Sequence, residues 1–213
     1  MRLPAFVGFA GIDENTNLGK AIELAEKFPV AWGILISETN NTSRYPSMEF
    51  CEEVIKNLPY TMVHFCGSIS REINKTGIVP EKLIPKSGAI QLNLRDEEYA
   101  LKNLEDVCEY TGLPVIRQSR DTDRFPELPE SIHALFDPSG GRGISIDNYP
   151  ISTKYHAVGY AGGFKPGNCH DFVQKCASVY YWIDMESGVR TNDWLDLDKC
   201  QAVCDEIYPT HKK

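Results

Sequence analysis

The stretch His133-Ala134-Leu135-Phe136-Asp137-Pro138-Ser139-Gly140-Gly141-Arg142-Gly143 shows the pattern that decides the fold of this chain. A continuous apolar run ends in a carboxylate, and a loop rich in glycine follows it. Continuous apolar runs are typical of strands buried on both faces, as in parallel sheets. We therefore predict a buried parallel strand here, whose carboxyl end opens onto a polar loop.

Seven further apolar runs lie on either side of this stretch, at 5–10, 30–36, 60–66, 89–92, 114–116, 156–161 and 180–185. Helix-patterned segments separate many of them, at 17–27, 47–57, 97–110, 168–176 and 197–207. Strands that alternate with helices predict βαβ units. An open doubly wound sheet would give a similar pattern, but eight repeats of this size favour closure into a single (β/α)8 TIM barrel. Pro126 and Pro129 predict a degenerate fifth helix.

Length and composition are those of one water-exposed globular domain. The 213 residues show no linker or shift in composition, so we expect a single domain over 1–213. The formal net charge of -8 argues against nucleic acid as a partner, because phosphate backbones are held by clustered Lys and Arg. No stretch approaches the roughly 20 apolar residues of a membrane span. The seven cysteines match no zinc or redox spacing, so we expect a cytoplasmic protein with reduced thiols, no metal and no cofactor.

Polar and glycine residues gather where the predicted strands end, which is where barrel enzymes carry their chemistry. Asp137 follows the sixth apolar run, and burial beside a dry pocket would suit it to act as a general acid. Gly162 and Gly163 follow the seventh run, and Ser187 and Gly188 follow the eighth. Successive glycine amides can form a nest for an anion. We therefore predict a phosphate site in these two loops, although glycines there also serve as plain turn residues.

Three other side chains are candidates for the same end of the barrel. Arg44 lies in the long segment 37–46, and its planar guanidinium could hold a carboxylate. His64 and Cys66 alternate along the third apolar run, so both can point inward. Residues of these types are also common as ordinary core or loop positions, so the sequence leaves both interpretations open.

Five motifs in order resemble the phosphoribosylanthranilate isomerase family over nearly the whole chain. The sixth-strand stretch is similar to the family's Asp followed by Gly-Gly-Thr-Gly, and the seventh to its Ala-Gly-Gly-Leu-x-Pro-x-Asn. The eighth is similar to Val-Asp-Val-Ser-Ser-Gly-Val, and two shorter motifs resemble Ser-Pro-Arg-Tyr and Val-Gln-Leu-His. In this sequence the five stretches are 136–143, 160–168, 183–189, 43–45 and 90–93.

The resemblance implies an Amadori rearrangement of a phosphoribosylamine to an open-chain ketose amine. Asp137 would be the acid that protonates the ring oxygen, and Arg44 would bind the anthranilate carboxylate. The substrate would also meet Gln91, Gly141, Arg142 and Gly143, and its phosphate would bind to Gly162, Gly163, Ser187 and Gly188. The family's base is a cysteine in Ile-Cys-Gly-Ile, and the matching stretch here is Phe9-Ala10-Gly11-Ile12.

Ala10 therefore stands where the resemblance implies the catalytic base, and a methyl group cannot accept a proton. Asp13, His64 and Cys66 are the candidate substitutes. Glu186 and Arg142 also depart from the family's serine and threonine. We expect an isomerase with an altered base that acts on a small phosphorylated sugar, as a monomer or homodimer. The alternatives are a phosphosugar-binding protein without catalysis, and a lyase or epimerase on another phosphorylated sugar.

Overall fold

The computed structural model describes residues 2–40, 42–120, 124–138, 140, 142–143, 149–153 and 157–209. Eight parallel strands form a closed barrel in chain order, and β8 completes the ring by pairing with β1. The fold is therefore the single (β/α)8 barrel that the sequence predicts. The strands are β1 (Val7–Ala10), β2 (Val30–Ile36), β3 (Thr61–Cys66), β4 (Gly88–Asn93), β5 (Val115–Ser119), β6 (Ile132–Phe136), β7 (Val158–Ala161) and β8 (Tyr181–Met185).

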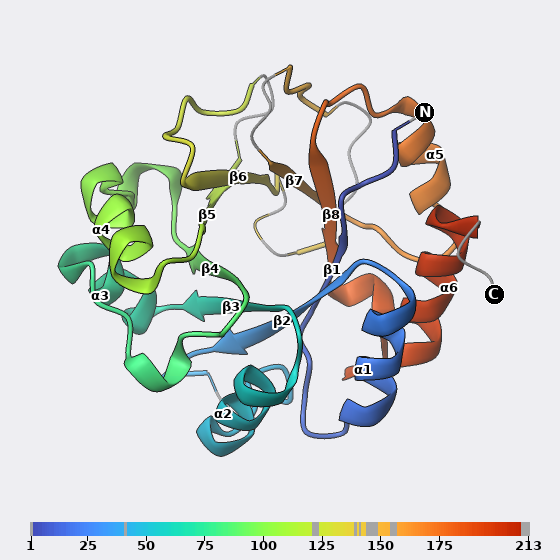
Figure 1. Ribbon diagram of the computed structural model, residues 1–213, viewed down its shortest axis with the longest axis horizontal. Coiled ribbons are helices and arrows are strands. Elements are labelled where there is room, and N and C mark those ends of the chain that lie inside the picture. Colours follow the sequence, from blue (N-terminus) through green and yellow to red (C-terminus); the bar gives the residue numbers. More distant parts are fainter. Residues whose placement is uncertain are drawn as a thin grey trace.

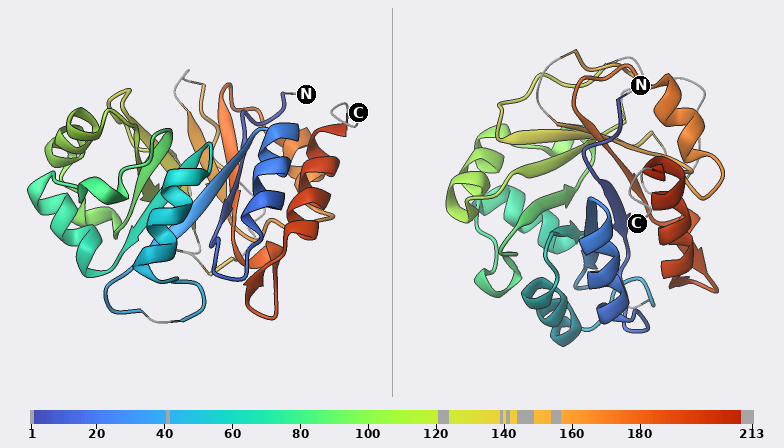
Figure 2. Two further views of the ribbon diagram at one scale, coloured as in Figure 1. Left: turned by 60° about the horizontal axis from the view of Figure 1, so that its bottom comes forward. Right: turned by 45° about the vertical axis from the view of Figure 1, so that its right-hand side comes forward.

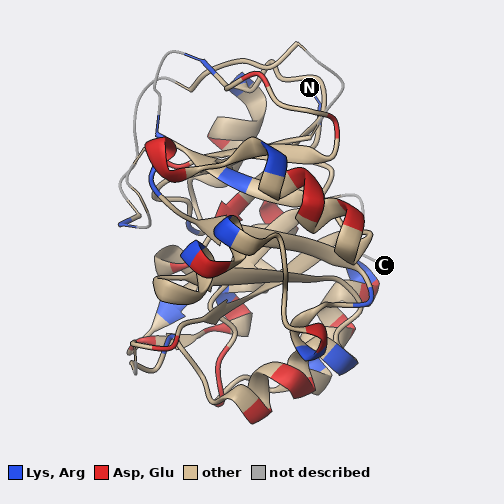
Figure 3. Ribbon diagram, turned by 90° about the vertical axis from the view of Figure 1, so that its left-hand side faces the viewer, with Lys and Arg blue, Asp and Glu red and all other residues tan. Residues whose placement is uncertain are grey.

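Helices surround the strands on most sides of the barrel (Figure 1, Figure 2). In the described part of the chain they are α1 (Leu18–Lys27), α2 (Met48–Asn57), α3 (Ser68–Thr76), α4 (Leu101–Thr111), α5 (Cys169–Lys175) and α6 (Leu197–Ile207). Shorter elements are η1 (Glu81–Leu83), η2 (Asp96–Glu98), η3 (Ser187–Val189) and the hairpin β9 (Arg190–Thr191) with β10 (Trp194–Leu195). Positive and negative residues are interspersed on the face of α3 and α4 (Figure 3).

Two helices begin where side-chain caps predict. The Asn17 side chain accepts a hydrogen bond from the Lys20 amide at 3.1 Å, and α1 starts at the next residue. Ser47 caps α2 in the same way by accepting from the Phe50 amide. Each bond satisfies an amide that has no partner within its own helix.

Helices α3 and α4 differ from the sequence expectation. No helix is predicted over α3, because only Ile69 and Ile73 of its nine residues are large apolar side chains. Helix α4 begins at Leu101 instead of residue 97, because Tyr99 is drawn toward β4. The Tyr99 hydroxyl donates to the Leu92 carbonyl at 2.6 Å, and this bond holds the chain extended between η2 and α4.

Loops run along the outside of the barrel at β6 and β7 (upper part of Figure 1). Residues 124–131 contain no helix, in agreement with the predicted degenerate fifth helix. Phe125 instead packs edge-on against Tyr160, with ring centroids 5.5 Å apart. Tyr149 packs against Phe172 in the same manner at 4.8 Å. Rings therefore bury the outer face of these strands where a regular barrel uses helices.

The barrel interior changes from apolar to polar along the strands. One layer is a compact apolar cluster that includes Ala31, Met62, Ile116, Leu135 and Trp182. Nearer the carboxyl ends, the inward positions of the same strands carry imidazole, amide and carboxyl groups. Function is therefore sought at this end of the barrel, which we call the mouth.

Candidate active site

A cavity of about 80 Å³ lies at the mouth, between the carboxyl ends of the strands. It brings together eight of the residues predicted from the sequence, which come from the strands near their carboxyl ends and from the loops that follow. These are Ala10, His64, Gln91, Asp137, Gly143, Gly162, Gly163 and Ser187. Gly188 belongs to the same loop as Ser187, in η3. Arg142 is exposed and does not line the cavity, and Gly141 lies outside the described residues.

Four buried polar atoms that find no hydrogen-bond partner in the described structure belong to residues lining this cavity. Glu186 Oε1 forms an ion pair with Arg44, and the other three are His64 Nε2, Gln91 Oε1 and Asp184 Oδ1. A buried polar group without a hydrogen-bond partner costs about 1–3 kcal/mol of folding stability, so three in one place are unusual in a core that serves packing alone. Hydroxyl groups of a bound sugar would supply the missing partners.

Two carboxyl groups face this space from β8 and from the end of β6. Asp137 is 3% exposed, and its backbone is held by its own amide donating to the Ser119 carbonyl at 2.9 Å. Asp184 is also buried, and burial raises its pKa well above the ordinary value, with the charges of Asp137 and Glu186 adding to the effect. Asp184 therefore keeps a proton where most carboxyls have lost theirs.

Asp184 was not among the residues predicted for the site. Its signal in the sequence is a carboxyl inside the apolar run that forms β8, two positions from the inward-facing Trp182. The side chains of Asn93 and Gln118 also line the cavity without having been predicted. Both follow the two-residue alternation of inward positions in β4 and β5.

His64 lies beside Ala10 because the strand between them has no side chain at the facing position. Gly33 of β2 pairs with Ala10 of β1, and the next strand is β3, which carries His64. A Cβ placed on Gly33 would lie 3.0 Å from His64 Nε2 and 3.1 Å from the Cβ of Ala10. The imidazole nitrogen therefore reaches over Gly33 to the neighbourhood of the position where the resemblance implies a catalytic thiol. Burial lowers the pKa of His64 to about 4, so the ring is neutral at neutral pH.

The loops after β7 and β8 contact one another closely. Gly188 has no room for a side chain, because a Cβ there would collide with the Phe164 carbonyl oxygen. Gly163 has a positive φ of 66°, a conformation that favours glycine. The amides of Gly163 and Gly188 make no hydrogen bond within the described structure. They are therefore available to a bound group, as in anion nests.

Arg44 and Cys66 line a second cavity of about 390 Å³, which shares Leu35, Asn93, Gln118 and Glu186 with the first. The Arg44 guanidinium forms ion pairs with Glu186 at 3.2 Å and with Asp193 at 3.0 Å. Burial raises the pKa of Cys66, whose sulfur accepts from Asn93 Nδ2 at 3.1 Å. Cys66 is therefore a neutral thiol and a poor proton acceptor.

Asp13 lies in the loop after β1 but outside both cavities. Its carboxylate is fully buried and forms an ion pair with Arg190 at 3.0 Å. It also accepts hydrogen bonds from the Leu195 amide at 2.7 Å and the Thr16 hydroxyl at 3.1 Å. Through these partners Asp13 joins the loop after β1 to the β9–β10 hairpin, and its carboxylate is not available as a base. The candidate bases thus reduce to His64 and Cys66.

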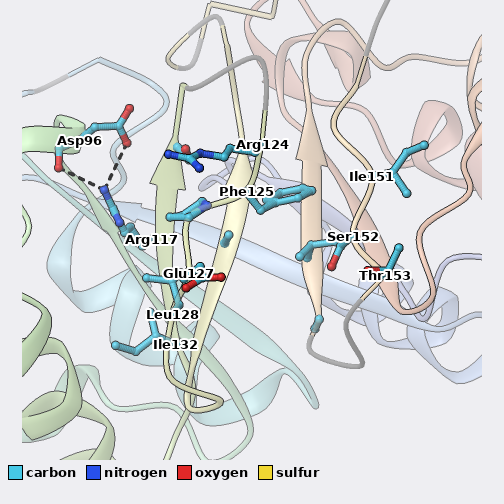
Figure 4. Close-up of a pocket in the computed structure, with 15 residues that line it drawn as sticks. Asp96, Arg117, Arg124, Phe125, Glu127, Leu128, Ile132, Ile151, Ser152 and Thr153 are labelled. Atoms are coloured by element: carbon cyan, nitrogen blue, oxygen red, sulfur yellow. Dashed lines mark hydrogen bonds and ion pairs between the residues drawn. The ribbon is translucent and has the colours of Figure 1, made fainter.

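Another cavity, of about 640 Å³, lies on the outer side of β5, β6 and β7 (Figure 4). Arg117 points there toward Asp96, with 3.7 Å between Nη2 and Oδ1, and also donates to the Asp96 carbonyl. Outward-facing Ile132 and Val158 form much of its floor. It is separated from the mouth by the barrel wall and carries none of the predicted site residues.

Within the described residues, no three His, Cys, Asp or Glu side chains lie close enough together to hold a metal ion. Nor does any described helix have the length and apolar character needed to cross a membrane.

The sequence model of the family described as N-(5'-phosphoribosyl)anthranilate (PRA) isomerase matches residues 86–206, more than half of the chain. The match covers Gln91, Asp137 and both glycine loops. Ala10, Arg44 and His64 lie before it. Among curated proteins, none matches this sequence.

Solved structures of the same kind resemble this barrel along its whole length. Phosphoribosyl anthranilate isomerase from Thermotoga maritima superposes with a TM-score of 0.63 at 18% identity, covering 96% of this chain and 99% of that one. The enzyme from Pyrococcus furiosus gives 0.59 at 16%, covering 96% and 98%. A phosphoribosyl anthranilate isomerase in complex with reduced 1-(o-carboxyphenylamino)-1-deoxyribulose 5-phosphate gives 0.59 at 17%, covering 96% and 99%. Likeness at these identities establishes the shared fold.

Proposed function

Because the chain belongs to the N-(5'-phosphoribosyl)anthranilate isomerase family, we propose that it is an aldose–ketose isomerase acting on a phosphoribosylamine such as N-(5-phosphoribosyl)anthranilate. The observation that carries this proposal is the mouth cavity. There the buried His64 Nε2, Gln91 Oε1 and Asp184 Oδ1, without partners in the described structure, surround the same space as Asp137. A sugar bound in this space would satisfy these atoms and lie against the acid.

The reaction needs an acid and a base on opposite sides of the sugar, and the barrel offers both. Asp137 directly follows β6. The imidazole of His64 reaches over Gly33, and Gly33 lies on β2, four strands away from β6 in the ring of eight. Asp137 would protonate the ring oxygen as its bond to C1 breaks, leaving a C1=N iminium. The base would then take the proton from C2, and the electron pair would form the C1=C2 bond of an enolamine. Protonation of the enolamine at C1, with loss of the hydroxyl proton from O2, gives the ketose amine. The protons delivered to the ring oxygen and to C1 match those removed from C2 and O2, so no atom is gained or lost.

We assign the base to His64. A neutral imidazole with a free ring nitrogen can accept a proton, whereas Cys66 holds its own proton and Asp13 is paired with Arg190. The low pKa makes His64 a weaker base than an exposed histidine, but the C2 proton of an iminium is acidic. The imidazole also reaches the neighbourhood of the Ala10 methyl, which stands in the family's base position.

The phosphate of the substrate would bind at the loops after β7 and β8. The amides of Gly163 and Gly188 support this, because among the described residues they have no hydrogen-bond partner, and such N–H groups are good donors to phosphate. The Ser187 hydroxyl adds a third donor on the same wall of the cavity. Asp137 and His64 would then act on the ribose between the phosphate and the nitrogen-bearing ring.

The test is turnover of freshly prepared N-(5-phosphoribosyl)anthranilate, followed by the loss of anthranilate-type fluorescence. We expect His64→Asn to lower kcat by roughly 10²–10⁴-fold, the usual effect of losing a general base. Asp137→Asn should do the same by removing the acid. His170→Asn is the matched control, because His170 lies on α5 away from the mouth, and it should leave turnover unchanged. An unaltered rate in His64→Asn would contradict the assignment of the base.

A second readout is the pH profile of kcat/KM. A base must be deprotonated in the free enzyme, so activity should fall on the acid side with an inflection near the pKa of His64, about 4. Adding Ala10→Cys to His64→Asn should restore part of the rate and move this inflection upward toward the pKa of a thiol. Restoration without such a movement would show that the thiol is not the new base.

Binding without catalysis is the second candidate function, and the Ala10 methyl is the observation that favours it. In that case the native protein would bind the phosphoribosylamine without turnover, and Ala10→Cys alone would create activity. His64→Asn could then weaken binding, since His64 lines the cavity, but it would have no turnover to lower. The same set of variants therefore separates the two functions.

A further inference from the structure

We propose that an anionic group on the aglycone, the part of the ligand attached to the sugar nitrogen, binds to Arg71, Arg95 and Arg120 instead of Arg44. This rests on the proposed function, because it takes the sugar to lie in the mouth cavity. It assigns a new subsite to the larger cavity of about 390 Å³ beside it.

The two cavities adjoin one another. Leu35, Asn93, Gln118 and Glu186 line both, so only these side chains stand between a ligand in the first and the space of the second. The glycine loops lie at the β7–β8 side of the mouth, whereas the larger cavity lies above β2 to β5. A phosphosugar anchored by its phosphate would therefore direct its nitrogen-bearing group toward the larger cavity.

Four arginines and two glutamates line the larger cavity, in a protein whose overall charge is -8. Arg71 comes from α3, Arg95 follows β4 and Arg120 follows β5. Glu98 faces the same space, but its carboxylate accepts a hydrogen bond from the Arg95 amide at 2.8 Å. No carboxylate of the described residues pairs with the side chains of Arg71, Arg95 or Arg120. The cavity thus has an excess of positive charge that a ligand anion would balance.

Arg44 differs from these three because its charge is already matched. Glu186 and Asp193 contact it at 3.2 and 3.0 Å, and Ser43 in turn donates to Asp193 at 2.6 Å. An aglycone carboxylate at Arg44 would have to displace these groups and would be repelled by Glu186. The pairs are partly exposed and therefore weak, but repulsion from the neighbouring carboxylate adds to the cost of displacing them.

Arg120 is placed for this role by the loop after β6. A Cβ on Gly140 would lie 2.6 Å from Nη2 of Arg120 and 2.7 Å from its Cζ, so the guanidinium packs flat against this glycine. A guanidinium whose plane is held in this way loses less side-chain freedom when it binds an anion in a bidentate manner. Arg120 also connects the loop that follows Asp137 with the larger cavity.

The experiment measures binding by calorimetry with two probes that differ by one charge. The first is reduced 1-(o-carboxyphenylamino)-1-deoxyribulose 5-phosphate, and the second is the same compound without the ring carboxyl. We expect the native protein to bind the first at least about tenfold more tightly, as for a charge-assisted hydrogen bond of about 1.5–3 kcal/mol. In Arg95→Gln/Arg120→Gln this ratio should fall to about one, and in Arg71→Gln it should fall in part. In Arg44→Gln it should remain.

The second probe also controls for folding, since its affinity should be equal in the native protein and in the arginine variants. A ratio that disappears in Arg44→Gln and survives in the double variant would overturn the proposal, as would a ratio of one in the native protein. A third probe, with a phosphonate in place of the carboxyl, distinguishes a subsite for a doubly charged group from a subsite for a carboxylate. Tighter binding would identify a doubly charged group, and equal or weaker binding a carboxylate. Because only binding is measured, an absence of turnover would leave this result intact.

Discussion

At the scale of single residues, Asp184 is a carboxyl group held away from water. It lies inside the barrel beside two other carboxyl groups, with one oxygen that finds no partner in the described structure. Burial is the first cause of its raised pKa, and the charges of Asp137 and Glu186 follow. The protein therefore gives up stability to hold this group in place, as functional sites often do.

This leads to a prediction on stability against pH. In the unfolded chain Asp184 loses its proton near 3.8, whereas in the folded protein it keeps the proton to a higher pH. Folding therefore takes up a proton between these two values, and stability falls as pH rises through that window. The amide introduced by Asp184→Asn cannot ionise, so this variant should become more stable than the native protein as pH rises from 4, by at most about 1.4 kcal/mol per pH unit. Urea unfolding at several pH values measures this, and a difference that does not vary with pH would contradict it.

At the scale of elements, the ion pair of Asp13 with Arg190 ties the start of the chain to its end. Arg190 is 7% exposed, and it also donates to the Gly11 carbonyl at 2.7 Å and to the Asp193 carbonyl at 2.6 Å. Through these bonds the β9–β10 hairpin is held against the loop that follows Ala10. The hairpin also carries Asp193, which contacts Arg44, so the pair positions one side of the mouth.

Arg190→Met should therefore lower the free energy of unfolding by roughly 3–5 kcal/mol, because it leaves the Asp13 carboxylate buried without its counter-charge. Lys102→Met on α4 is the matched control, since its side chain is 85% exposed and its change should stay within about 0.5 kcal/mol. Urea unfolding of both variants measures the difference. Equal stability of the two would show that Asp13 is sustained by the Leu195 and Thr16 hydrogen bonds alone.

At the scale of the whole molecule, the barrel is predictable because it depends on a repeated pattern. Eight apolar runs are enough to indicate eight buried parallel strands, and Pro126 and Pro129 are enough to weaken the fifth helix. Helix α3 was not predicted from the sequence, because it has too few large apolar residues to show a helical period. The ion pair of Asp13 with Arg190 could not be predicted from the sequence, because the two residues are 177 positions apart. The approach of His64 to Ala10 needs the strand order of the closed barrel, which no local pattern contains.

The uneven cover of the barrel has a measurable result. Strand β2 is buried throughout and lies beneath α1 and α2, whereas the outer face of β6 borders the cavity of about 640 Å³. Amide hydrogens of β6 should therefore exchange with solvent faster than those of β2, roughly tenfold or more at neutral pH. Hydrogen–deuterium exchange with mass spectrometry would show it. Equal protection of the two strands would mean that aromatic packing stabilises this side as well as helices stabilise the other.

Gly33 also bears on the order in which the sequence could have changed. Without a side chain at this position, a thiol at position 10 and an imidazole at position 64 can be accommodated side by side. On the assignment of the base to His64 proposed above, a chain that carried both groups would hold two proton acceptors at the mouth. Any larger residue at position 33 would close this route, because its Cβ would lie 2.8 Å from the Cα of Ala10. On that assignment, one glycine leaves the space in which the catalytic group can be moved from β1 to β3.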